Sequence, residues 1–198
     1  MRLHDAVVSP VATKQTKGAW YKGWRLVSLD GSTLDVADTR ANEQAFGRPG
    51  ASRGSSAYPQ IRFVSLVENG GHVLFGSRMD GCRTGEVTLA GKVIGSLAKG
   101  MLCLADRNFF GFELWQKAHS TGSELLWRVK KNVRLVPLER LADGSYLAKI
   151  YPSAKDRRNL RNAITVRAIE YRLVSVPDAE PVYRLVTTVL EESASSRQ

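Results

Sequence analysis

Asp106 ends a short apolar run and is a residue whose type and position suggest chemistry. The run, residues 101–105, has the composition of a buried strand, and Arg107 follows Asp106 directly. A side chain at the carboxyl end of a strand in an α/β sheet commonly opens onto a crevice from a rigid support. Asp106 is therefore a candidate site residue. The alternative is that it only caps a helical segment that begins near Asn108.

Asp30 is a second acid in a similar setting. The apolar run of the β-prone segment that starts at Trp24 ends on it, and Gly31 permits a close approach or a turn directly afterwards. Asp35 and Asp38 are rivals nearby, but the apolar run ends on Asp30. The two acids are distant in sequence, so only a sheet in which their strands are neighbours brings them together. Such a pair of carboxylates would hold Mg²⁺ or Mn²⁺ beside a phosphodiester and activate the attacking oxygen.

At these residues the chain resembles a known family. The segments LDGSTLDV at 29–36, AFGRPG at 45–50 and LADRNFFG at 104–111 together resemble the DDE transposases of bacterial insertion sequences. The resemblance is to the cut-and-paste group with a Tyr-Arg-Glu-Lys signature, and it extends from about residue 20 to about residue 190. It implies that Asp30 is the first catalytic aspartate, that Asp106 is the second, and that both hold Mg²⁺ or Mn²⁺.

The resemblance also implies partners and a third acid. The expected substrate is double-stranded DNA, both the transposon ends and the target, and full-length members of the family allow for a homodimer. The third acid should be a Glu in a Tyr-x-x-Arg-x-x-x-Glu helix, but no such motif follows residues 187–190. We therefore expect a C-terminally truncated chain whose final helix is missing. Glu191 or Glu192 is the alternative source of a third carboxylate.

Composition limits the class of protein. The 198 residues include 43% hydrophobic and 24% charged residues, which are ordinary globular values that favour one domain. The net charge of +10 favours a polyanionic partner, and nucleic acid fits best because no amphipathic cationic helix or lipidation signal points to a membrane. Cys82 and Cys103 suggest no disulfide framework, and without a signal peptide the cytoplasm is the expected location.

The order of predicted elements indicates an α/β fold with a ribonuclease-H-like core. Residues 20–36 are predicted to form the first strand and its return, and 61–68 and 72–79 the next two strands. A helix from 84 to 100, the strand ending at Asp106, a helix around 112–118 and a strand at 124–130 are expected to follow. In this βββ-α-β-α-β order the first and fourth strands lie side by side. Val87, Ala90, Val93, Ile94 and Leu97 are predicted to share the core face of the first helix.

The chain is divided accordingly. Residues 1–18 are a leader, 19–131 the partial ribonuclease-H-like core, 132–190 a β-rich insertion region and 191–198 a tail. Within the core, residues 39–59 are rich in Gly, Ser, Arg and Pro and are predicted to form a loop. In the insertion, two hairpins are expected, with the densest basic run of the chain between them.

Ten basic residues are candidates for DNA contacts, because Lys and Arg neutralise backbone phosphates without regard to sequence. They are Arg48, Arg53, Arg107, Arg128, Lys130, Lys131, Lys155, Arg157, Arg158 and Arg161. For residues 155–161 a solvated loop is an equal alternative, and Arg107 could instead pair with a surface acid. Trp127 could stack on an extruded base, but a strand Trp is more often part of the core, which we favour.

The function that these features predict is that of a partial DDE transposase catalytic domain, which binds DNA but has little or no activity. The family reaction is metal-dependent cleavage and strand transfer at transposon ends. Two alternatives remain open. One is a non-catalytic DNA-binding remnant or regulator, and the other is a ribonuclease-H-like nuclease that uses only the two aspartates.

Overall fold

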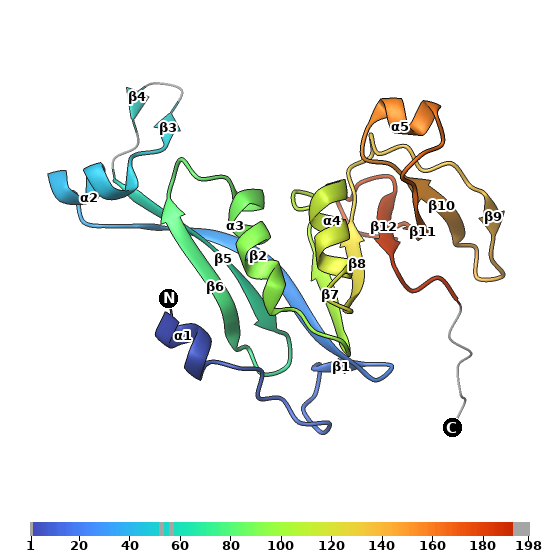
Figure 1. The fold of residues 1–198 in the computed structure, drawn as a ribbon, viewed down its shortest axis with the longest axis horizontal. Helices are drawn as coiled ribbons and strands as arrows, with labels where there is room; N and C mark the ends of the chain where they lie inside the picture. The colour runs from blue at the N-terminus through green and yellow to red at the C-terminus, as the bar shows by residue number, and fades with distance from the viewer. Residues whose placement is uncertain (1, 52–53, 56–57, 192–198) are drawn as a thin grey trace.

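The fold is organised around one large mixed sheet (Figure 1). The computed structural model describes residues 2–51, 54–55 and 58–191, and within these ranges the strand order is β6-β5-β2-β7-β8-β12-β11-β10-β9, with β1 paired to β2. The strands are β1 Trp20–Tyr21, β2 Trp24–Asp35, β3 Gly50–Ala51, β4 Gly54–Ser55, β5 Gln60–Glu68, β6 Leu74–Gly81, β7 Met101–Ala105, β8 Glu124–Arg128, β9 Glu139–Arg140, β10 Tyr146–Ile150, β11 Ile164–Tyr171 and β12 Tyr183–Thr187. The helices are α1 Arg2–Val7, α2 Arg40–Phe46, α3 Glu86–Val93, the 3-10 turn η1 Ile94–Ser96, α4 Phe112–His119 and α5 Ala154–Arg158.

The first half of the sheet is an antiparallel meander to which parallel strands are added. β2 pairs antiparallel with β5, and β5 with β6 through a turn at 69–73. β7 then lies parallel to β2 on its other side, and β8 parallel to β7. A parallel neighbour needs a crossover connection, and α3 and α4 supply the two crossovers. The result is a mixed α/β fold with one large sheet and few helices, compatible with the ribonuclease-H-like architecture expected from the sequence.

Both crossover helices cover the same face of the sheet (Figure 1). The core lies between them and the sheet, with Trp115 of α4 and Trp127 of β8 fully buried and in edge-to-face contact, their centroids 5.2 Å apart. One detail of the predicted helix face is wrong. Leu89 rather than Val87 is buried in the core with Ala90, Val93, Ile94 and Leu97, and Val87 is half-exposed.

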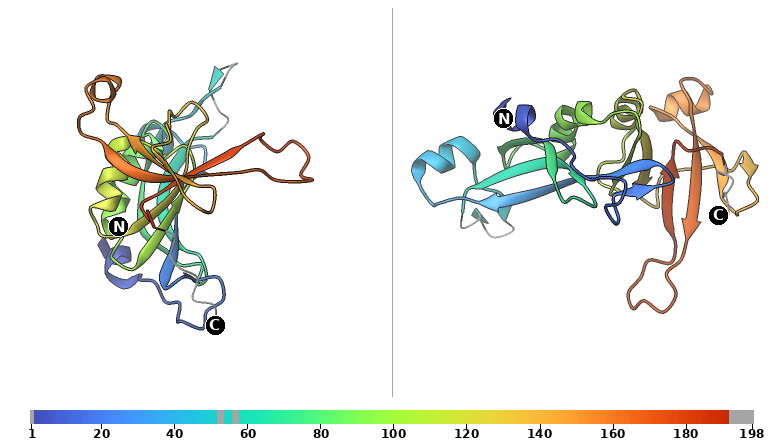
Figure 2. Two further views of the ribbon diagram at one scale, coloured as in Figure 1. Left: turned by 90° about the vertical axis from the view of Figure 1, so that its right-hand side faces the viewer. Right: turned by 90° about the horizontal axis from the view of Figure 1, so that it is seen from below.

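The second half of the sheet, β8-β12-β11-β10-β9, is antiparallel throughout. It forms one end of the molecule, and the loop between β11 and β12 projects far from the sheet (Figure 2). The two predicted hairpins of this region are present. Their strands are shorter than the apolar runs suggested, because residues 133–138 and 172–182 lie outside the paired segments.

Three short helices occur where the sequence predicts none. α2 interrupts the expected loop at 39–59, where Thr39 Oγ1 accepts the Asn42 N–H at 3.2 Å as an N-cap, and α5 lies within the basic run of the insertion. α1 belongs to the segment expected only as a leader. It packs against β6, and Asp5 pairs with Arg78 of that strand at 2.9 Å. None of the described helices combines the length and apolarity needed to cross a membrane.

Candidate active site

Asp30 and Asp106 lie side by side because β2 and β7 are paired in parallel. In that pairing Leu29 is opposite Ala105, and the next residue after each of them is an aspartate. Both side chains line one open cavity of about 470 Å³. Its other lining residues are Ser28, Leu29, Leu104, Ala105, Leu126, Arg128 and Leu185.

The cavity is on the face of the sheet away from α3 and α4. Along β2, Val27 and Leu29 are buried in the helix-covered core, so the alternation of a strand turns Ser28 and Asp30 to the other face. Ser28 Oγ donates to Asn69 Oδ1 at 2.8 Å, while Asp30 Oδ1 accepts the Gly31 N–H at 2.8 Å. The Asp30 carboxylate is exposed, so it is accessible from the cavity side.

Gly31 lies close to side chains of neighbouring elements, and its backbone angle does not itself call for glycine. A Cβ at this position would lie 3.3 Å from the carboxylate of Glu86 and from the side chain of Val64. A larger residue here would need the side chains of Glu86 and Val64 to shift by a few tenths of an ångström. Of the two roles expected for this glycine, the close approach is the one found. The turn is not present, because β2 continues through Gly31 to Asp35.

The donor set fits a hard divalent cation in part. Two carboxylates on one open face provide the oxygen ligands that Mg²⁺ and Mn²⁺ prefer, and such ions normally retain several waters. Within the described residues, no group of three or more His, Cys, Asp or Glu is placed to hold a metal. Glu191 is exposed and does not line the cavity, and Glu192 lies outside the described residues.

One of the predicted DNA-binding residues lines this cavity, and a second follows one of its aspartates in the chain. Arg128 is among its lining residues, and Arg107 directly follows Asp106. Both guanidinium groups contact the same carboxylate oxygen of Glu180, at 2.8 Å from Arg128 and 2.6 Å from Arg107. Pairing with a surface acid, the alternative for Arg107, is thus the arrangement found. Nothing in the sequence points to Glu180, because in the loop between β11 and β12 no local pattern distinguishes it from any other turn residue.

The remaining candidates are dispersed. Five of them are exposed: Lys130, Lys131, Lys155, Arg158 and Arg161. Arg157 is half-buried, with its guanidinium 5.9 Å from the Tyr151 ring centroid.

Arg48 lies in a different environment after α2. Its side chain is only 16% exposed and pairs with Asp38 and, at 3.2 Å, with Glu43. The hydrogen bonds to these two acids raise the pKa of Arg48. Arg53 lies outside the described residues. The guanidinium group of Arg48 is therefore paired with two acids and is not openly available to a DNA phosphate.

Two residues of β7 and β8 have structural roles. Trp127 is completely buried, so the core interpretation holds and stacking on a base would require the core to unpack. Burial raises the pKa of the Cys103 thiol to about 12. A thiol with so high a pKa is not a nucleophile at neutral pH, and Cys103 is a small core residue.

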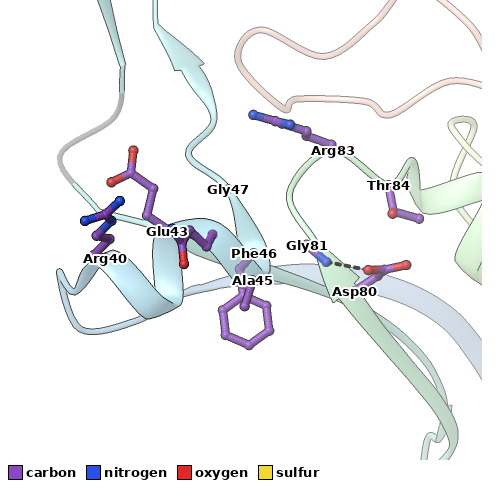
Figure 3. A pocket seen from close by; sticks show the side chains of 10 residues that line it. Arg40, Glu43, Ala45, Phe46, Gly47, Asp80, Gly81, Arg83 and Thr84 are labelled. Carbon is purple, nitrogen blue, oxygen red and sulfur yellow. Dashed lines mark hydrogen bonds between the residues drawn. The ribbon is translucent and has the colours of Figure 1, made fainter.

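A second cavity, of about 540 Å³, lies between α2 and the end of β6 (Figure 3). Its acids already have partners. Asp80 Oδ1 accepts the Gly81 N–H at 2.8 Å, which with the Thr84 side chain lowers the pKa of Asp80, and Glu43 pairs with Arg48. Although this cavity is larger than the aspartate cavity, we do not assign the chemistry to it. Glu43 is paired with Arg48, and the two acids of this cavity come from α2 and β6 and not from neighbouring parallel strands.

Comparisons with known proteins identify the family. The chain belongs to the family described as the transposase DDE domain, whose model matches residues 22–197. It is 25% identical to the transposase InsG for insertion sequence element IS4 of Escherichia coli strain K12, in an alignment 203 residues long, gaps included, that covers 96% of this chain and 45% of that protein. It is also 25% identical to the putative transposase InsZ of the same organism, over 59% of this chain and 39% of that protein. The chain thus spans less than half the length of either curated relative.

Proposed function

We propose that this chain supplies the part of a DDE transposase catalytic domain that carries the first two acids, Asp30 and Asp106. The observation that carries the proposal is the parallel pairing of β2 with β7, which puts both aspartates on one open cavity. In this proposal β2, β5, β6, β7 and β8 with α3 and α4 are a ribonuclease-H-like core. Residues 132–190 are the β-rich insertion, and the tail begins at residue 191.

The proposed substrate is double-stranded DNA, bound with a phosphodiester at the cavity. Asp30 and Asp106 would hold Mg²⁺ or Mn²⁺ there, and that ion, when bound, polarises a phosphodiester and activates the attacking oxygen. Arg128 supports the same role from the chain itself, because a cation at the cavity wall compensates the charge of a phosphate. Leu104, Leu126 and Leu185 contribute apolar side chains to the wall of this open cavity.

We further propose that these 198 residues on their own bind DNA and cleave it little or not at all. Phosphoryl transfer by two metal ions usually recruits more carboxylates than the pair at this cavity. The same observation favours a second candidate function, a non-catalytic DNA-binding regulator that occupies sites used by complete transposases. Efficient cleavage of a nicked duplex of arbitrary sequence would instead support a nuclease that needs only two aspartates.

Binding of Mn²⁺ to the purified protein tests the site without any need for turnover. Free Mn²⁺ measured by electron paramagnetic resonance should fall when wild-type protein is added, and Asp30→Asn and Asp106→Asn should each weaken the binding about tenfold or more. Asp35→Asn, at the exposed far end of β2, is the matched control and should bind like wild type. Equal Mn²⁺ affinity in wild type and Asp30→Asn would overturn the proposed metal site.

DNA cleavage is then measured on a labelled duplex with Mn²⁺. We expect binding without efficient strand cleavage. Efficient cleavage that Asp30→Ala abolishes would show that the two acids suffice, and it would contradict the proposed inactivity while supporting the site.

A further inference from the structure

Glu180 connects the insertion to the candidate active site. The carboxylate comes from the loop between β11 and β12, whereas Arg107 and Arg128 come from the ends of β7 and β8. Both arginines contact Oε1 of Glu180, at 2.6 and 2.8 Å. Since Arg128 also lines the cavity of Asp30 and Asp106, the carboxylate lies at the edge of that cavity.

Aromatic packing holds this arrangement in place. The Glu180 N–H donates to Tyr183 Oη at 3.2 Å, and the Arg128 guanidinium lies 4.7 Å from the centroid of the Tyr183 ring. Tyr183 in turn stacks on Tyr171 of the neighbouring strand, with centroids 5.2 Å apart. Contacts with residues of β8, β11 and β12 thus help to position Glu180.

Two guanidinium groups that point at one carboxylate oxygen could bind a phosphate oxygen in the same way. Arginine forms charge-assisted hydrogen bonds with carboxylate and phosphate oxygens alike, so the ligand of such a pair can be exchanged. We propose that Arg107 and Arg128 form a site for one backbone phosphate of DNA beside Asp30 and Asp106, and that Glu180 occupies this site until DNA displaces it. The inference rests on the proposed function, because it takes DNA as the ligand of the cavity.

The exposure of the three side chains makes the exchange feasible. Arg107, Arg128 and Glu180 are 43%, 27% and 38% exposed, and ion pairs in contact with water contribute little net stability. The carboxylate is nevertheless charged in the free protein. Its partial burial raises the pKa, but the hydrogen bonds from Arg128 and Arg107 outweigh that effect and leave the pKa of Glu180 below its ordinary value.

The test compares DNA affinity by fluorescence anisotropy on one labelled duplex at fixed salt. Glu180→Gln removes the competing charge but keeps the shape, and we expect it to bind the duplex roughly three- to tenfold more tightly than wild type. Glu139→Gln, on the exposed edge strand β9, makes the same change in net charge and is the matched control. Its affinity should stay within about twofold of wild type, because distant exposed charges are screened.

Two double variants identify the cause of the gain. If the phosphate site consists of Arg107 and Arg128, Glu180→Gln should give no gain in the background of Arg107→Gln or of Arg128→Gln. All these side chains are exposed in part, and a thermal melt of each variant confirms that it is folded. The inference is overturned if Glu180→Gln binds no more tightly than Glu139→Gln, or if its gain survives both arginine substitutions.

Failure of the proposed function has a different signature. If neither wild type nor any variant binds the duplex, DNA is not the ligand, and both the proposed function and this inference fall. If wild type binds and Glu180→Gln shows no gain, only the exchange at the arginine pair is wrong. Weaker binding by Glu180→Gln would show that Glu180 positions the arginines and does not compete with phosphate.

Discussion

At the scale of single residues, acidic side chains of this protein have contrasting roles that follow from their partners. Asp30 has a backbone amide as its hydrogen-bond donor and faces the cavity, whereas Asp143 is bound by Ser145 and by Arg167 of β11. Arg167 is itself almost buried, and it also donates to Ser145 Oγ at 2.8 Å and to the Glu191 carbonyl at 2.9 Å. Asp143 therefore has a structural role, and the stability of the folded protein depends on whether its carboxylate is charged.

The contribution of Asp143 should depend on pH. Hydrogen bonds from the Ser145 hydroxyl and amide, and then from Arg167, lower the pKa of Asp143 below its ordinary value of 3.8. A lowered pKa in the folded state means that the stabilisation is present above 3.8 and is lost as the pH falls through the folded value. Asp143→Asn should therefore reduce the free energy of unfolding at neutral pH, as measured with urea. The difference from wild type should shrink steadily in acid, and a constant difference would contradict the assignment.

At the scale of elements, a buried carboxylate ties the N-terminal segment to the sheet. Glu68, at the end of β5, is fully buried and accepts the N–H groups of Val11 and Ala12, each at 3.0 Å. Its other oxygen pairs with Arg25 of β2. A Cβ on Gly71 would lie 2.2 Å from this carboxylate, so the turn before β6 needs glycine there. Residues 11–12 are thus bound into the fold through one side chain.

Removing the charge of Glu68 should be costly. In Glu68→Gln the amide NH₂ must face either Arg25 or the backbone donors, so at least one buried contact becomes a donor against a donor. Breaking one side of a buried pair costs about 3 kcal/mol, which should appear in the free energy of unfolding measured with urea. Glu113→Gln, on the exposed surface of α4, is the control and should change that free energy by less than about 0.5 kcal/mol. Similar values for both variants would show that Glu68 does not anchor the segment.

At the scale of the whole molecule, the net charge is +10, and its basic side chains differ in whether an acidic partner neutralises them. Arg48, Arg107 and Arg128 have acidic partners, while the α5 region presents Lys155, Arg158 and Arg161 to solvent. If DNA lies across the cavity and reaches the insertion, these exposed cations contact backbone phosphates and release counterions.

The salt dependence of binding reports how many phosphates the protein neutralises. Replacing Lys155, Arg158 and Arg161 together by Ala should weaken duplex binding and reduce the slope of log K against log salt by about 0.9 for each phosphate that is no longer neutralised. The control replaces exposed lysines outside the insertion, Lys14, Lys17 and Lys99, and removes the same charge. Equal slopes for the two triple variants would indicate that binding depends on net charge alone and that the α5 region makes no specific contact.

How well each helix or strand could be predicted from the sequence depends on how clear its pattern of apolar residues is. Strands such as β5, β7 and β8 and the helices α3 and α4 bury apolar side chains, so their periodicity is visible in the sequence. The helices α2 and α5 bury no residue, and only an N-cap, Thr39 or Ser153, indicates where each begins. Without an apolar stripe, the composition of these two segments does not distinguish a short helix from a loop.

The sequence by itself determined that Asp30 and Asp106 each end an apolar segment, because that signal lies within a few neighbouring residues. Only the tertiary structure decided that the two segments are paired strands, that Glu180 lies on Arg107 and Arg128, and that Arg48 is paired with acids. The pairing of β2 with β7 and the contacts of Glu180 join residues far apart in the chain, and no local pattern encodes which distant side chain will be adjacent. Their geometry follows from strand order and register, which the packing of the whole sheet sets.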